Sequence, residues 1–394
     1  MQEKRIAFLF FGDYPCGGAE FVISIITSYI ASHGFKVYIA GVIREEFLSD
    51  RDKQNATFVN LTSEEVTPKQ WAKTSVRICQ ELQLDILAIQ CVQSPDINYV
   101  AANTTTKLVF CEHGKPGWER TLRKMRRIKK AERSTAAYLK YNLLTRPIEW
   151  LFNPLYRQSR NQYRLTYNTC AAYTLLCEAY KEPLCRMMQV DGAKFHAINN
   201  PLLPLAEEVY PDKKQELIYM GRLTYEDKRV DKLLQIWALL YREFPDWTLS
   251  IVGDGAEKEA LKQLSKDLSL ERIFFRDYTT DPLQYYRHAA ILCLTSDTEG
   301  WGMVLAEAQQ AGVIPVAFDC SAGVRTILAP TGENGMLVPP AAGIQGYAQT
   351  LRDLMSDEPM RRRIQQNGII KAKQYDLDYI GAQWCDLFDS VLKA

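Results

Sequence analysis

The chain has 394 residues, of which 47% are hydrophobic and 24% are charged, and its formal net charge is +1 at pH 7. This length predicts two domains, and the composition is typical of a soluble globular protein. A balanced charge excludes a globally basic surface of the kind that binds nucleic acid, so any attraction to anions must be local. No stretch of the sequence approaches the ~20 apolar residues of a membrane span.

The first half of the chain alternates short apolar runs with helical patterns, as a doubly wound parallel sheet does. Apolar residues recur at helical spacing from Phe21 to Ile30, and Gly34 follows as a cap. A second helix is predicted over Glu178–Gln189. Residues 114–165 interrupt the alternation and predict a helical insertion rich in Arg, Lys and Tyr. The predicted strands are Ile6–Phe11, Lys36–Val42, Leu84–Gln90, Lys107–Cys111 and Ala171–Cys177.

A proline-bearing break at Asn199–Pro204 is the predicted linker. Strand and helix patterns then resume, with a helix over Val230–Glu243 and helical sequence from Asp357 to the end. The sequence therefore predicts two αβ domains joined near residue 200. The predicted strands of the second domain are Glu216–Met220, Trp247–Val252, Ile273–Phe275, Ile291–Leu294 and Ile314–Phe318.

Cysteine and histidine usage bears on compartment and metal content. The ten cysteines form no C-x-x-C pair and several stand in apolar runs, which predicts buried free thiols in a reducing cytoplasmic compartment. The four histidines are far apart in the sequence and show no ligand spacing. No structural metal is therefore expected. The apolar run near the N-terminus is too short for the core of a signal peptide.

Glycines follow two predicted strands where a helix is about to begin. Gly17 and Gly18 precede the first helix, where backbone N–H groups and the helix dipole attract anions. Gly221 opens the loop after the first strand of the second domain, and Arg222 and Lys228 in this loop suit a diphosphate. An ordinary tight turn and two solvated basic residues are the alternatives.

Two glutamates flank the turn Gly300-Trp301-Gly302 that follows another predicted strand. Glu299 would lie in the loop and Glu307 about two turns into the next helix, so both can face one ligand. Carboxylates accept hydrogen bonds from neighbouring hydroxyls, which suits a sugar and a ribose. The alternative is an acidic helix start and a surface glutamate.

His113 and a basic segment are further candidates. His113 follows a buried strand, where it could exchange a hydrogen bond with a substrate hydroxyl, or be structural. The basic segment would form an amphipathic helix that binds anionic lipid head groups or the acceptor, or a solvated helix. Because no aromatic platform accompanies it, nucleic acid is not expected as a partner. Its candidate contact residues are Arg120, Arg123, Lys124, Arg127 and Lys130.

Together these motifs resemble the retaining glycosyltransferases of family 4, which have the GT-B architecture. Trp301 stands where the family usually has Phe, and the segment 319–325 resembles the form found in lipopolysaccharide and capsule glycosyltransferases. The insertion 114–165 matches no pattern of the family. The matching segments are the E-x7-E motif from Glu299 to Glu307, Gly221-Arg222-Leu223 with Lys228, the turn Gly253-Asp254-Gly255, and the loop Gly17-Gly18-Ala19-Glu20.

The resemblance implies two Rossmann-like doubly wound parallel-sheet domains that face a central cleft. Residues 1–204 would bind the acceptor, residues 205–374 would bind the nucleotide-diphospho-sugar, and the helix 375–394 would pack back on the first domain. The implied activity is retaining transfer of a hexose or N-acetylhexosamine, expected from UDP, to a cell-surface glycan, polymer or lipid-linked acceptor. No cofactor and no metal are expected, and the protein would be cytoplasmic or peripheral at the inner membrane face.

The resemblance also implies roles for individual residues. Arg222 and Lys228 would neutralise the diphosphate leaving group, where fixed cations lower the barrier. Glu307 would bind the ribose, Glu299 would hold the donor sugar, and His113 would lie beside that sugar. The other residues expected to contact the donor are Gly17, Gly18, Gly221, Gly253, Asp254, Gly300, Trp301, Gly302 and Met303.

Two other functions remain open. A GT-B-fold UDP-sugar epimerase would isomerise the sugar nucleotide without an acceptor. A non-catalytic membrane-associated scaffold would keep the fold and use the basic segment as its working surface.

Overall fold

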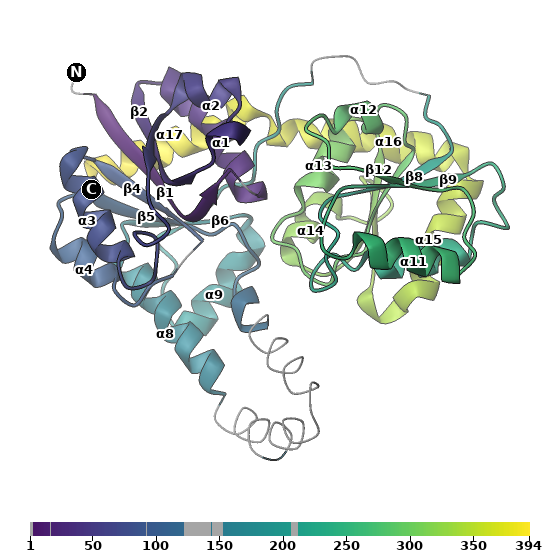
Figure 1. The fold of residues 1–394 in the computed structure, drawn as a ribbon, viewed down its shortest axis with the longest axis horizontal. Coiled ribbons are helices and arrows are strands. Elements are labelled where there is room, and N and C mark those ends of the chain that lie inside the picture. The colour runs from purple at the N-terminus through teal and green to yellow at the C-terminus, as the bar shows by residue number, and fades with distance from the viewer. Residues whose placement is uncertain (1–2, 16, 92, 122–142, 144–152, 206–211) are drawn as a thin grey trace. The chain divides into compact units, whose positions relative to one another are not determined.

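The structure is a computed structural model that describes residues 3–15, 17–91, 93–121, 143, 153–205 and 212–394. The chain divides into two compact units, Met1–Pro201 with Leu377–Ala394, and Leu202–Asp376. Each unit contains one parallel sheet flanked by helices (Figure 1).

Unit 1 is built on a seven-stranded sheet in the order β3-β2-β1-β4-β5-β6-β7. Its strands are β1 (Lys4–Tyr14), β2 (Phe35–Ile43), β3 (Thr57–Asn60), β4 (Ile86–Gln90), β5 (Lys107–Cys111), β6 (Ala172–Leu175) and β7 (Phe195–Ala197). Its helices are α1 (Gly18–Ser32), α2 (Asp50–Asn55), α3 (Trp71–Glu81), α4 (Ile97–Ala102), α8 (Pro154–Thr169), α9 (Lys181–Met188) and α17 (Leu377–Lys393). The central strands are buried on both faces, which explains their continuous apolar runs.

The C-terminal helix α17 packs on α1 within unit 1. A Cβ on Gly381 would lie 2.3 Å from the ring of Tyr29, so only a glycine allows the two helices this approach. Phe388 lies edge-on to Phe8 and Phe35 of the sheet, with ring centroids 6.3 and 6.0 Å apart. The last helix of the chain therefore completes the core of the first unit.

Unit 2 has a six-stranded sheet in the order β10-β9-β8-β11-β12-β13. Its strands are β8 (Glu216–Met220), β9 (Thr248–Val252), β10 (Ile273–Arg276), β11 (Ile291–Leu294), β12 (Ile314–Phe318) and β13 (Met336–Val338). Its helices are α10 (Val230–Ala238), α11 (Lys258–Asp267), α12 (Leu283–Tyr286), α13 (Met303–Gln310), α14 (Ala322–Leu328), α15 (Gly343–Ser356) and α16 (Glu358–Ala372). Trp237 and Tyr347 are fully buried against this sheet, and the Tyr347 hydroxyl donates to the Val316 carbonyl over 2.6 Å.

The predicted strands are all present, but the sequence analysis missed three short ones. These are β3, β7 and β13, each of which lies at an edge of its sheet. An edge strand is less buried than a central one, so its apolar signal is weak, and the two terminal residues of β3 are exposed. The helix predicted to reach Glu243 ends at Ala238, and the C-terminal helical region is broken between α16 and α17.

Candidate functional site

The loops that carry Arg222, Lys228 and Glu299 lie side by side in unit 2. One follows β8 and the other follows β11, which are neighbours in the sheet. Their chain connections run to opposite sides, because β9 lies beyond β8 and β12 lies beyond β11. Ligands of doubly wound sheets bind at such a switch point, at the carboxyl ends of the strands.

Lys228 and Glu299 form an ion pair between these two loops. Lys228 Nζ lies 2.7 Å from Glu299 Oε1, and the Ser296 hydroxyl donates to the same oxygen over 2.7 Å. The two side chains are 18% and 10% exposed. Each charge of a pair this sheltered needs the other, because a single buried charge without its counter-charge destabilises the fold. The structure thus brings together two residues that lie 71 positions apart in the sequence.

A second set of contacts ties the two loops together. The Asp297 N–H donates to the Asp227 carbonyl over 2.8 Å, and the Thr295 hydroxyl donates to the Arg229 carbonyl over 3.0 Å. Asp297 also pairs with Arg229 over 2.8 Å and with Lys232. Burial opposes the ionisation of Asp297, but the two cations hold its pKa below the usual value. These contacts fix the backbone on either side of the Lys228–Glu299 pair.

Arg222 differs from Lys228 in being open to solvent. Its side chain is 70% exposed, and its guanidinium lies 3.2 Å from Asp227 Oδ2. The Tyr219 hydroxyl donates to the Arg222 carbonyl over 2.7 Å and fixes the backbone. Among the described residues the guanidinium is bonded at one edge, by Asp227, and its other N–H groups can bind an anion.

The loop from Gly221 to Leu223 is crossed by the turn from Gly253 to Gly255. A Cβ on Gly253 would lie 1.9 Å from the Gly221 carbonyl oxygen, and one on Gly255 would lie 2.4 Å from that of Leu223. The Leu223 N–H donates to the Asp254 carbonyl over 2.8 Å. Glycine is therefore required where the two backbones meet, and the predicted diphosphate loop packs directly against the turn Gly253-Asp254-Gly255.

In the turn Gly300-Trp301-Gly302 the indole of Trp301 points into the core, so the turn can offer a ligand only its backbone. Trp301 is 2% exposed and packs edge-on against Tyr375, with ring centroids 4.8 Å apart. Gly302 has a φ of +93° and caps α13, which begins at Met303. Any contact of Trp301 with a ligand would come from its main chain.

Glu307 lies in the second turn of α13, and the residue is partly buried. The buried Tyr286 hydroxyl donates to Glu307 Oε2 over 3.3 Å. Burial raises the pKa of Glu307 to about 7, even though the hydrogen bond from Tyr286 lowers it. The carboxyl group therefore changes its charge near neutral pH.

The predicted residues of unit 1 also lie at carboxyl ends of strands. Gly17 and Gly18 open α1 after β1, and a Cβ on Gly17 would lie 2.8 Å from Glu20 Oε2. His113 follows β5, and its Nε2 lies 2.7 Å from Gln90 Oε1 at the end of β4. Burial lowers the pKa of His113 to about 4, so the imidazole is neutral at pH 7.

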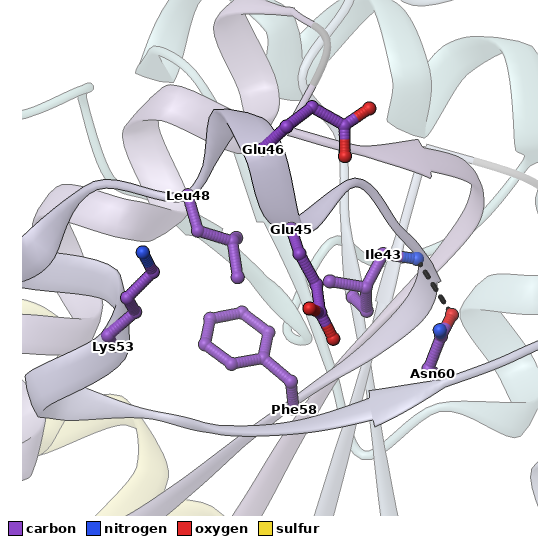
Figure 2. A pocket seen from close by; sticks show the side chains of 7 residues that line it. All are labelled: Ile43, Glu45, Glu46, Leu48, Lys53, Phe58 and Asn60. Atoms are coloured by element: carbon purple, nitrogen blue, oxygen red, sulfur yellow. Dashed lines mark hydrogen bonds between the residues drawn. The ribbon is translucent and has the colours of Figure 1, made fainter.

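Unit 1 has a cavity at the carboxyl ends of β2 and β3, with a volume of about 530 Å³ (Figure 2). The Asn60 side-chain oxygen accepts a hydrogen bond from the Ile43 N–H over 3.0 Å. Figure 2 shows Glu45 pointing toward Phe58 and Ile43. The cavity is lined by Ile43, Glu45, Glu46, Leu48, Lys53, Phe58 and Asn60.

The structure describes one of the candidate contact residues of the basic segment. Arg120 is described, and its guanidinium lies over the ring of Tyr156, 5.1 Å from the centroid. Arg123, Lys124, Arg127 and Lys130 lie outside the described residues. Among the residues that are described, no helix is long and apolar enough to span a membrane. In that same part of the chain, no three His, Cys, Asp or Glu side chains form a metal-binding group.

Sequence reasoning missed several side chains that organise these sites. Ser296 and Asp297 lie three and two residues before Glu299, so their place beside the motif is a usable signal. Tyr286 and Gln90 have no such signal in the sequence, because each lies on a different element from its partner and reaches it only in the folded chain.

Comparison with known proteins shows which family unit 2 is similar to. Residues 206–371 match the family described as glycosyl transferases group 1. Unit 2 is therefore similar to that family, which confirms a resemblance to group 1 glycosyltransferases, and the assignment to the retaining family 4 stays a prediction. The match ends before α17 and leaves the first 205 residues of the chain outside it.

Relatives share about half of the chain. A Haemophilus influenzae protein named as a glycosyltransferase is 32% identical over 221 residues, which are 56% of this chain and 62% of that protein. The Erwinia amylovora amylovoran biosynthesis glycosyltransferase AmsD is 31% identical over 196 residues, which are 50% of this chain and 53% of AmsD. The chain thus spans less than two thirds of the length of these relatives.

Solved structures share the fold of the whole chain. The lipopolysaccharide outer core galactosyltransferase WaaB has a TM-score of 0.67 at 19% identity, over 98% of this chain and 99% of WaaB. The Anabaena protein HepE in complex with UDP and glucose has a TM-score of 0.72 at 18% identity, over 98% of this chain and 100% of HepE. These similarities confirm the predicted GT-B fold.

Proposed function

We propose that this protein is a retaining glycosyltransferase that moves a hexose or N-acetylhexosamine from UDP to a hydroxyl of a cell-envelope glycan, polymer or lipid-linked acceptor. The observation that carries the proposal is the sheltered Lys228–Glu299 pair at the switch point of unit 2, beside the exposed Arg222. The names of the relatives support an envelope acceptor, and the UDP bound to HepE supports a UDP donor.

Arg222 and Lys228 bind the diphosphate in this proposal. Negative charge grows on the phosphate oxygen as the bond to the sugar breaks, so fixed cations stabilise the transition state more than the ground state. Lys228 is preorganised by Glu299, and Arg222 supplies a planar donor set on the solvent side. The side chains provide the charge neutralisation, and the proposal requires no metal.

Glu299 and Glu307 bind the two sugars of the donor. Glu299 keeps its second oxygen for a hydroxyl of the transferred sugar, close to the diphosphate that Lys228 binds. Glu307, two turns into α13, accepts from the ribose hydroxyls. Both carboxylates position the donor and neither acts as a nucleophile.

Transfer occurs on one face of the sugar. The bond from the anomeric carbon to the diphosphate oxygen breaks, and a bond from that carbon to the acceptor oxygen forms on the same side. The proton of the acceptor hydroxyl passes to the departing phosphate oxygen. His113 bonds a hydroxyl of the sugar and holds it in place.

Unit 1 binds the acceptor in this proposal. The cavity at β2 and β3 offers carboxylates, an amide and an aromatic ring, which together suit a sugar. The basic segment would bring the enzyme to an anionic membrane.

Lys124→Glu with Arg127→Glu should then weaken binding to anionic vesicles, as measured by vesicle sedimentation, and leave donor hydrolysis unchanged. Unchanged sedimentation would contradict the membrane role.

A panel of sugar nucleotides tests the function directly. Thermal shift finds the donor, because a ligand that binds the native state raises its stability by mass action. Transfer to envelope glycan acceptors is then followed by UDP release, with exposed Lys262→Ala as the matched control for Lys228→Ala. An isomerised sugar nucleotide without acceptor would indicate an epimerase, and no binding of any sugar nucleotide would overturn the proposal.

A further inference from the structure

Gln90 contacts His113 at the carboxyl ends of two neighbouring strands. Gln90 is the last residue of β4 and is 3% exposed. It pairs in register with Cys111, the last residue of β5, two residues before His113. The side chains therefore meet where two hydrogen-bonded strands end rather than on a long loop.

The orientation of the Gln90 amide follows from its second contact. Gln90 Nε2 donates to the Ala88 carbonyl over 2.9 Å. The reverse orientation would place two acceptor oxygens against each other at that distance. The amide oxygen therefore faces His113, with Oε1 2.7 Å from Nε2.

This orientation fixes the tautomer of His113. An amide oxygen only accepts, so Nε2 of His113 must carry the hydrogen. In the neutral imidazole the other nitrogen, Nδ1, is then a bare acceptor. Nδ1 is buried and has no hydrogen-bond partner among the described residues.

Glu112, the ionisable residue next to His113, does not disturb the hydrogen bond between Gln90 and His113. Glu112 is 2% exposed, and its Oε2 accepts from the Tyr173 hydroxyl over 3.1 Å. Burial raises the pKa of Glu112 to about 8, and Glu119 adds to the effect, so its carboxyl group is largely protonated at pH 7. Among the described residues, no carboxylate bonds His113 Nδ1.

We propose that Gln90 is a positioning residue that holds His113 in the Nε2–H form, so that Nδ1 accepts a hydrogen bond from a hydroxyl of the sugar substrate. The hydroxyl contact rests on the proposed function, whereas the tautomer does not. A protonated imidazole could not make this contact, because both of its nitrogens donate.

Nitrogen-15 NMR of the histidines reads the tautomer in the full-length protein without any substrate. The chain has four histidines, and His33 is an internal reference because it has the opposite tautomer. His33 Nδ1 lies 2.7 Å from the Tyr29 carbonyl oxygen, so its hydrogen must be on Nδ1. We expect His113, assigned by its loss in His113→Gln, to show the Nε2–H pattern.

Two substitutions separate positioning from packing. Gln90→Leu keeps the shape but removes the acceptor, so the tautomer becomes mixed and kcat falls about five- to tenfold, the effect of about one hydrogen bond. Affinity for UDP, which lacks the transferred sugar, stays unchanged. Gln90→Glu keeps an acceptor, so the Nε2–H form persists and the acid limb of the pH–rate profile moves upward with the pKa of His113. The exposed Gln80→Leu is the control.

The two parts of the proposal fail separately. A wild-type His113 with its hydrogen on Nδ1, or a tautomer ratio unchanged in Gln90→Leu, overturns the role of Gln90. If a UDP-sugar binds and the His113 nitrogen shifts do not move, the hydroxyl contact is wrong. If no UDP-sugar binds at all, the proposed function fails and the hydroxyl contact with it, while the tautomer result still decides the role of Gln90.

Discussion

The residues with the largest expected effects are charged groups whose surroundings are set by other elements. Lys228 and Glu299 are the clearest case, because each is mostly buried and each needs the other. Ser296 supplies a further hydrogen bond to Glu299. A substitution at either position therefore affects both the stability of unit 2 and the binding of a diphosphate.

Lys228→Ala should lower the free energy of unfolding by about 1–3 kcal/mol, because the sheltered Glu299 carboxylate loses its cation. It should also lower kcat by about 10²- to 10³-fold through loss of charge stabilisation at the leaving group. Chemical denaturation and the UDP-release assay measure the two effects.

A second variant distinguishes the effect of the Lys228–Glu299 pair on stability from its effect on activity. Lys228→Met with Glu299→Leu removes both charges and should recover much of the stability but none of the activity. Lys262→Ala, in an exposed pair with Glu259, is the control and should change neither. An active Lys228→Ala enzyme would contradict the assigned role.

Glu307→Gln should change how stability depends on pH. The folded-state pKa of about 7 lies above the ordinary value, so this group favours folding below about pH 4.5, and the benefit is lost as the pH rises through 7. Relative to the wild type, the Gln variant should therefore gain about 1–3 kcal/mol of unfolding free energy between pH 5 and 8. Denaturation at both pH values measures the gain.

The same variant should bind UDP about tenfold more weakly at pH 8, because an ionised carboxylate accepts stronger hydrogen bonds from the ribose. Exposed Glu333→Gln is the matched control and should alter neither property. Equal UDP affinity in the wild type and Glu307→Gln would exclude Glu307 from the ribose site.

At the scale of elements, turns set the position of the site by close backbone packing. The turn 253–255 crosses the loop after β8, and the first turn of α14 presses on the Gly300-Trp301-Gly302 turn. A Cβ on Gly323 would lie 2.1 Å from the Gly300 carbonyl oxygen and 2.6 Å from Trp301 Cα. Gly323 thus determines how closely α14 approaches the start of α13.

Gly323→Ala should displace this turn and lower the melting temperature, with an overpacking cost of about 1–3 kcal/mol. The Michaelis constant for the UDP-sugar should rise, because the amides after Glu299 move. Calorimetry and steady-state kinetics measure these effects. Gly12→Ala is the control, since no atom lies within 4 Å of its added Cβ. If Gly323→Ala is destabilised but has an unchanged Michaelis constant, the turn does not take part in donor binding.

At the scale of the whole molecule, the two units bury separate cores, and the chain returns to unit 1 through α17. The candidate donor residues of the E-x7-E motif and of the β8 loop all belong to unit 2. A nucleotide that binds these residues should therefore stabilise unit 2 first.

UDP at about 100 times its Kd should stabilise unit 2 by about 2.7 kcal/mol. Hydrogen exchange should slow around residues 221–229, 253–255 and 295–307, while the central strands of unit 1 keep their rates. Exchange detected by mass spectrometry, with UDP and with uridine alone, makes the comparison. Protection confined to unit 1 would place the nucleotide elsewhere.

Much of this architecture is determined by the sequence alone. The central strands were predictable because strands buried on both faces need continuous apolar runs, and the E-x7-E motif and the β8 loop were predictable because their residues are close in sequence. The edge strands β3, β7 and β13 were not, since a short half-exposed strand leaves little apolar signal.

Only the tertiary structure decided how the motifs combine. Sequence spacing could not show that Lys228 pairs with Glu299, that Trp301 is buried and offers only its main chain, or that Tyr286 and Gln90 bond Glu307 and His113. The order of strands in a doubly wound sheet brings distant loops to one edge, and the geometry there sets burial, charge and hydrogen bonding. For this reason the residue types were readable from the chain, whereas their partners, protonation and tautomers depend on the fold.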